Sequence, residues 1–163
     1  GPPAGGPAAC THLYFVAAAR WRWQDGAMLY AIFLMMAAAS PPPFAWVTYI
    51  PGESIIHGIA ETDSRDLRID CTTGGRLDVI VWSDVAAASG ATVPVVLKAN
   101  GKSYRVPAVV FDGDMPQLVA PVAANHPFIR ALLRGQSVSV NNNPPVPGAG
   151  AAQHLKPLIA ACK

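Results

Sequence analysis

The sequence is poor in charge: Asp, Glu, Lys and Arg make up only 13% of its residues, where about 25% is usual. The formal net charge at pH 7 is +2, which excludes the strongly basic surface typical of nucleic-acid-binding domains. The basic side chains from residue 65 to residue 105 are also spread over two predicted hairpins rather than clustered. We therefore expect no nucleic-acid partner.

Motifs for the common cofactors are missing as well. There is no C-x-x-C pair and no H-x-x-x-H for zinc, and neither the G-x-x-x-x-G-K-[ST] nor the G-x-G-x-x-G nucleotide pattern occurs. The acidic loop at 112–114 lacks the spaced oxygen ligands of a calcium-binding loop. We expect neither a metal nor another cofactor.

The most apolar segment is too short to span a membrane. Residues 27–39 are 13 in number, whereas a spanning helix needs about 20. This length suits the apolar core of a signal peptide, and Arg20 and Arg22 lie just upstream of it. We predict that residues 1–39 are an N-terminal extension with a cleaved export signal, so that the protein is periplasmic or secreted. A buried helix and an uncleaved membrane anchor are the alternatives for residues 28–40.

Cysteine is scarce, and this simplifies the pairing. Only Cys71 and Cys162 fall in residues 40–163, the segment predicted to form a single β-rich domain. In an oxidising compartment two thiols favour a disulfide. We predict a Cys71–Cys162 bond, with two buried free thiols as the alternative.

Alternation of apolar and polar residues predicts strands through most of this domain. Residues 67–71 and 76–82 read as a hairpin. A second hairpin covers 93–111, where Asn100-Gly101 supplies a type I′ turn. Its prolines, Pro94 and Pro107, cannot donate to a ladder, so these strands should lie at edges or carry bulges. Further strands are expected at 53–62, 117–123 and 136–140.

Two short helices complete the predicted fold. Asn125 is the expected N-cap of a helix that stops at Gly135. A second helix should begin near Gln153, which would place Pro157 in its first turn. The fold class is α+β and mainly β: an antiparallel sheet or two-layer sandwich of about six strands, with two short helices packed on it.

Three segments carry a resemblance to a known family. The order "LRIDC…GG…VIVW", a hairpin, "HPFIRALLRGQSVSV" and a closing "HLKPLIAAC" is similar to small exported alpha-proteobacterial proteins of the invasion-associated locus B type. The likeness covers residues 65–162 and rests on spacing and apolar pattern. It implies a leader-bearing periplasmic domain and transfers no catalytic residues.

Candidate functional residues are few. Trp46, Tyr49 and Trp82 are the candidate binding residues, because exposed aromatics anchor protein interfaces; the alternative is that they close the ends of the core. The turn at 63–66, which includes Arg65, reads as solvated surface. We predict a non-enzymatic domain that binds a protein or a cell-envelope component.

Two further readings remain open. One is a small periplasmic hydrolase with a dispersed site, for example Ser83, His126 and Asp112. The other is a membrane-anchored domain that retains its leader.

Overall fold

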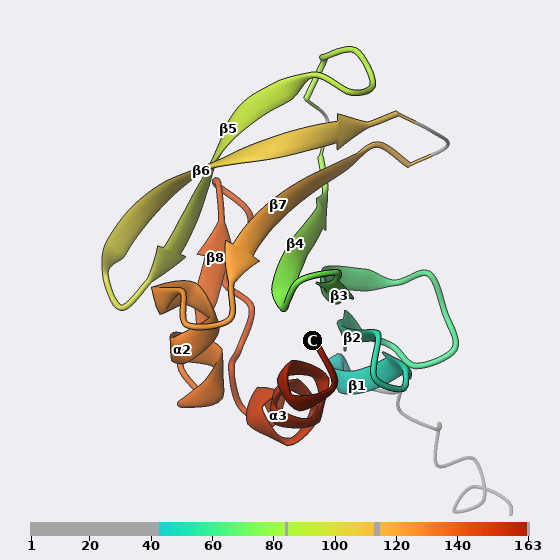
Figure 1. Ribbon diagram of the computed structural model, residues 1–163, viewed down its shortest axis with the longest axis vertical. Coiled ribbons are helices and arrows are strands. Elements are labelled where there is room, and N and C mark those ends of the chain that lie inside the picture. The colour runs from blue at the N-terminus through green and yellow to red at the C-terminus, as the bar shows by residue number, and fades with distance from the viewer. Residues whose placement is uncertain (1–42, 84, 113–114, 163) are drawn as a thin grey trace, which may run out of the picture. The chain divides into compact units, whose positions relative to one another are not determined.

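The fold is built on one antiparallel sheet in a computed structural model that describes residues 43–83, 85–112 and 115–162. The predicted export signal lies outside the described residues. Within them, eight strands follow the order β1-β2-β3-β4-β7-β6-β5-β8 (Figure 1). The strands are β1 (Ala45–Ile50), β2 (Ser54–Gly58), β3 (Arg65–Thr72), β4 (Arg76–Trp82), β5 (Thr92–Ala99), β6 (Lys102–Phe111), β7 (Gln117–Ala123) and β8 (Val138–Val140).

This architecture confirms the predicted mainly β class and the antiparallel sheet. The strands number eight rather than about six, and they form one sheet instead of a two-layer sandwich. Strand β1 had no counterpart among the predicted strands. Its sequence, AWVTYI, does not alternate polar with apolar residues, so the period-two signal is missing there.

Local sequence determines the β5–β6 hairpin. Asn100 and Gly101 both have positive φ, at 54° and 71°, as a type I′ turn requires. The register then pairs Val95 with Val106 and Leu97 with Tyr104. Pro94 and Pro107 pair with one another in the stretch of the hairpin that neither neighbouring strand reaches, because β8 pairs only with 97–99 of β5 and β7 only with 109–111 of β6.

The two helices of the described residues, α2 (Pro127–Leu133) and α3 (Ala151–Ala161), lie on the same side of the sheet (Figure 1). Helix α2 is capped by His126 rather than Asn125, because the His126 imidazole accepts the Phe128 backbone N–H at 3.2 Å. Helix α3 begins two residues earlier than predicted, so Pro157 falls inside it instead of in its first turn. Pro157 lies on the exposed side, where water can hydrate the carbonyl that loses its helical partner.

The core lies between the inner face of the sheet and the two helices. Alternate strand residues point inward and pack against buried helix residues. Representative members, all at most 2% exposed, are Leu67, Ile69, Leu77, Leu97, Leu118, Phe128, Leu132, Leu155 and Leu158. No helix among the described residues is both long and apolar enough to cross a membrane.

Neither helix covers the outer face of the sheet, to which the intervening strand residues point. Ile56 and Ile80 both pair with Arg68 across this face and are 1% and 6% exposed. Side chains of the sheet itself therefore shield part of the outer face, and the candidate functional residues lie there.

Candidate functional site

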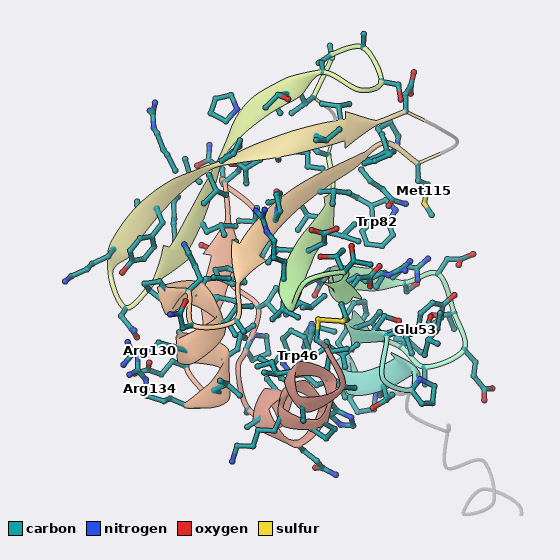
Figure 2. The ribbon with its side chains drawn as sticks, in the orientation of Figure 1. Trp46, Glu53, Trp82, Met115, Arg130 and Arg134 are labelled. Carbon is teal, nitrogen blue, oxygen red and sulfur yellow. A yellow bond between two sulfur atoms is a disulfide. The ribbon has the colours of Figure 1, made fainter. Side chains whose placement is uncertain are left out.

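The three predicted aromatic residues separate into two environments. Trp46 is 4% exposed; its indole N–H donates to the Pro147 carbonyl at 2.7 Å, and its ring lies 5.4 Å from that of His57. In Figure 2, Trp46 lies next to α3, whereas Trp82 lies at another part of the sheet, close to Met115. Trp46 thus joins β1 to the segment before α3, and only Tyr49 and Trp82 remain available to an outer-face site.

An aromatic–arginine cluster, formed by Tyr49, Arg65, Arg68 and Trp82, occupies the outer face. The Arg65 guanidinium carbon lies 4.8 Å from the centre of the Trp82 ring and 5.3 Å from that of Tyr49. The Arg68 guanidinium is 5.5 Å from the Tyr49 ring. Each such contact stabilises by about 0.5–2 kcal/mol, more when water is excluded. The two arginines therefore hold both rings in place.

A shift in strand register brings Arg65 into this cluster. The pairing of β2 with β3 runs His57 to Leu67 and then Gly58 to Arg65, which leaves Asp66 as the extra residue of a bulge. Asp66 consequently bonds to inward-pointing His57, at 3.2 Å, while Arg65 reaches the outer-face rings. Gly58 is required here, because a Cβ at this position would collide with the Ser64 carbonyl oxygen.

The predicted solvated turn is thus wrong for Arg65, whose side chain is only 10% exposed. Among the described residues its one ion-pair contact is Asp63 at 3.6 Å, and that carboxylate is 88% exposed. Within the described part of the chain, Arg65 Nε and Nη1 and Trp82 Nε1 are buried without an acceptor. A buried polar group left unpaired costs about 1–3 kcal/mol. The cluster therefore contains three hydrogen-bond donors that have neither an acceptor nor solvent-accessible surface.

A shallow groove of about 450 Å³ continues along the outer face from Arg68 to Met115. Arg68 forms a bidentate ion pair with Asp70, in which Nε and Nη2 of the guanidinium each lie 2.6 Å from one carboxylate oxygen. Two exposed apolar side chains also line the groove, Phe111 at 52% and Met115 at 43% exposed, together with the polar Asp112 and Gln117. The groove thus combines apolar contact area with a fixed ion pair.

Burial changes the acidity of the two carboxyls that face each other across β3 and β4. Desolvation raises the pKa of Asp70 above its usual value of 3.8, an effect that Arg68 opposes. Desolvation also raises the pKa of Asp78, and the neighbouring charge of Asp70 adds to it. Asp70 and Asp78 are direct cross-strand partners, so the two negative charges repel each other at neutral pH.

The Cys71–Cys162 disulfide forms as predicted, with a Cα–Cα distance of 5.4 Å. It ties the C-cap of α3 to β3, and Figure 2 draws the bond in yellow. The bond connects residues 91 apart in the sequence. The disulfide lies at the inner face of the sheet, whereas the candidate binding face is on the other side. We therefore assign the disulfide a role in stability and not in binding.

The structure does not bring the suggested hydrolase residues together. The Ser83 backbone bonds to Pro116 just before β7, whereas the His126 backbone bonds to Ala123 at the far end of β7. Seven residues of strand, about 20 Å, separate these ends. Asp112 follows β6 at the Ser83 end. Ser83, His126 and Asp112 therefore cannot act as one triad.

The three described histidines are already engaged in other contacts. His57 bonds to Asp66, His154 Nδ1 lies 3.0 Å from the Thr48 hydroxyl, and His126 caps α2. Burial lowers the pKa of His126, which keeps its ring neutral and able to accept the capping hydrogen bond. Within the described residues, no three His, Cys, Asp or Glu side chains gather to hold a metal.

Comparison with known proteins finds no matching family, no matching curated protein and no matching solved structure. The site therefore has to be interpreted from its own geometry. The sequence pointed to Tyr49 and Trp82 but not to Arg65, whose burial depends on the bulge. Gly58 inside a strand pattern was the signal for that bulge, since a strand glycine often marks one.

Proposed function

We propose that this protein is an exported, disulfide-stapled, non-enzymatic domain that binds a protein or cell-envelope component through the outer face of its sheet. The observation that carries the proposal is the aromatic–arginine cluster on a face that neither helix covers. Tyr49 is 46% exposed, and Arg68, which contacts its ring, also lines the groove together with Phe111 and Met115.

The composition of this face is that of a binding surface. Aromatic residues, Met and Arg are enriched in interface cores and dominate binding hot spots. Preorganisation adds to this, because contact with Arg65 and Arg68 restricts the Tyr49 ring before any partner arrives. Covering Tyr49 on binding therefore costs little side-chain freedom at that position.

Export is supported by the disulfide, because such bonds persist in oxidising compartments, and by the pattern of residues 1–39. An intact mass measured after expression with residues 1–39 in place tests this part. Loss of about the first 39 residues, with Cys71 and Cys162 resistant to alkylation, is the expected result. A full-length mass with alkylated cysteines would contradict export.

Site-specific photo-crosslinking tests the binding face. A benzophenone amino acid replaces Phe111, which is exposed and aromatic, in cells that export the protein. The matched control carries the same group at Lys156, which is exposed on α3 on the helical side of the sheet. We expect discrete adducts from position 111 and none from position 156.

Tyr49→Ala should reduce the adducts from position 111, because it removes the ring that both arginines contact. Co-sedimentation with purified cell-wall polymer covers the case in which the partner is not a protein. The binding face is refuted if positions 111 and 156 give the same adducts, or if neither crosslinking nor co-sedimentation responds to Tyr49→Ala.

A further inference from the structure

The few charged side chains of this domain are separated by sign along the chain. Residues 43–83 contain three arginines and six acidic residues, which are Glu53, Glu61, Asp63, Asp66, Asp70 and Asp78. Residues 85–111 and 115–162 contain no acidic residue and six basic ones, which are Lys98, Lys102, Arg105, Arg130, Arg134 and Lys156. The small net charge of the chain therefore does not reflect an even distribution of charge.

Three of the six basic side chains lie close to the turn of the β5–β6 hairpin. Lys98 and Lys102 flank the Asn100-Gly101 turn. Lys98 pairs with Ser103, so Arg105 is its diagonal neighbour across the ladder, at a distance of about 7–8 Å between backbones. The hairpin thus carries its positive charge at the turn.

Helix α2 adds Arg130 and Arg134 at the same place. Strand β8 pairs Val138 with Ala99, so Gln136, two residues before Val138, lies near the turn. Arg134 Nε donates to the side-chain oxygen of Gln136 at 3.2 Å. Figure 2 shows Arg130 and Arg134 next to each other on α2. We call Lys98, Lys102, Arg105, Arg130 and Arg134 together the basic end of the domain.

The basic end is exposed and its charge is not compensated. Four of its side chains are exposed, and that of Lys98 is half-buried. Among the described residues, no carboxylate lies within ion-pair distance of any of the five. By contrast, two of the three arginines in residues 43–83 form ion pairs. The five cations therefore produce a positive potential that an anionic partner can neutralise.

The arrangement of the cations indicates the kind of partner. They are spread over two strands and a helix, which suits an extended anionic surface better than one small anion, because a small anion needs donors that converge on it. Tyr104 lies between Lys102 and Arg105 in the sequence, but its ring packs edge-on against that of His126 at 5.3 Å. Proteins that bind single-stranded nucleic acid stack bases on such rings. Anionic lipid headgroups need only positive charge near the bilayer surface.

We infer that the basic end docks the domain on a membrane that contains anionic phospholipids. This surface goes beyond the proposed partner face, since it surrounds the hairpin turn, whereas Phe111 is the last residue of β6 at the opposite end of the hairpin. The negative bilayer repels the acidic part of the domain. Docking therefore orients the domain and leaves the groove lined by Phe111 open to a partner.

Co-sedimentation of the full chain with lipid vesicles tests the inference. Vesicles of equimolar phosphatidylglycerol and phosphatidylcholine are compared with vesicles of phosphatidylcholine alone. Each Lys or Arg near an anionic surface strengthens binding about fivefold, so the five cations give a dissociation constant of about 0.1–1 mM lipid. We expect binding to pure phosphatidylcholine to be at least about tenfold weaker. Raising the salt concentration from about 0.1 M to about 0.5 M should remove most of this difference.

Two double variants with the same change in net charge separate the basic end from the total charge. Lys102→Gln/Arg130→Gln should weaken binding to the phosphatidylglycerol vesicles about 25-fold, because it removes two cations of the basic end. Arg76→Gln/Lys156→Gln removes two exposed cations elsewhere, at the start of β4 and on α3, and should weaken binding less than about twofold. In the described part of the chain none of these four side chains forms an ion pair.

A gadolinium-carrying lipid in the phosphatidylglycerol vesicles gives a second readout, which needs no variant. In ¹⁵N-labelled protein it should broaden the amide signals of Gly101 and Gly135, which flank the basic end. The signals of Gly52 and Gly74, in the turns after β1 and β3, should broaden less.

The inference is overturned if both vesicle types bind equally, if the two double variants weaken binding equally, or if Gly52 and Gly74 broaden most. Displacement of the protein from vesicles by a DNA duplex at equal phosphate concentration would also overturn it, in favour of a nucleic-acid partner. None of these readouts involves a protein partner, so the basic end and the crosslinked face can fail independently.

Discussion

Removal of the Cys71–Cys162 bond should destabilise the domain strongly, because the bond closes a long loop. The bonded residues are 91 apart in the sequence, and the chain-entropy model gives such a crosslink about 4–5 kcal/mol. Domains of this size are stable by about 5–15 kcal/mol in total. The bond therefore supplies a large share of the stability, and its loss should lower the melting temperature by about 10–20 °C.

The assay is urea unfolding followed by circular dichroism, in a Cys10→Ala background that prevents disulfide exchange with the third cysteine. Oxidised protein is compared with the same protein in reductant and with the Cys71→Ala/Cys162→Ala variant. The slope of the unfolding free energy against urea should rise on reduction, because the open chain exposes more surface. Reductant should leave the double variant unchanged.

A decrease of less than about 1 kcal/mol would refute this reasoning. Such a result would mean that the reduced unfolded chain is already compact, or that packing of α3 alone closes the loop. The packing of α3 is substantial, since Leu155 and Leu158 are at most 2% exposed. The double variant separates packing from the covalent constraint because it leaves both leucines in place.

Two titratable groups give further predictions. Asp78→Asn should raise the unfolding free energy at pH 7 by about 0.2–1 kcal/mol, because it removes the charge repulsion from Asp70. This gain should vanish near pH 3, where the carboxyls are protonated. Urea titrations that give equal gains at both pH values would contradict this. His126→Ala should lower the unfolding free energy by about 1 kcal/mol at pH 8, because the hydrogen bond that caps the Phe128 N–H is lost, and by less at pH 5. His126→Asp should restore the cap. A loss of stability that does not depend on pH would exclude the capping role.

The signs follow from the direction of each pKa shift. The folded state raises the pKa of Asp78, so it binds that proton more tightly than the unfolded chain, and stability falls as pH rises above 3.8. The folded state lowers the pKa of His126, so the unfolded chain takes up the proton first. The stabilisation by His126 is therefore complete above its usual pKa of 6.5 and decreases as pH falls below it.

The features of this fold that depend on local sequence signals were predictable. The Asn100-Gly101 turn set the register of β5 with β6, and two cysteines in the domain left a single pairing. The pairing of β7 with β4 was not predictable, because a long stretch of chain separates these two strands, whereas β6 and β7 are consecutive. Pro121 is tolerated there because β6 pairs with β7 only along residues 117–119.

The site was less predictable than the fold. Aromatic residues can be picked out from the sequence, but whether each one is buried depends on the strand opposite. Trp46 is covered by residues after β8, whereas Tyr49, three positions later, is 46% exposed. Arg65 reads as a turn residue in the sequence and becomes a buried cation only because the bulge at Asp66 turns it toward Trp82.

The bond from Trp46 to Pro147 spans 101 residues, and it has a consequence for the timing of folding. Ribosomes add about 5–20 residues per second, so roughly 5–20 s separate the synthesis of β1 from that of its cover. During that interval the indole cannot reach its acceptor and β1 cannot pack on α3. Until translation has passed residue 147, Trp46 therefore lacks the segment that covers it, and this end of the core is incomplete.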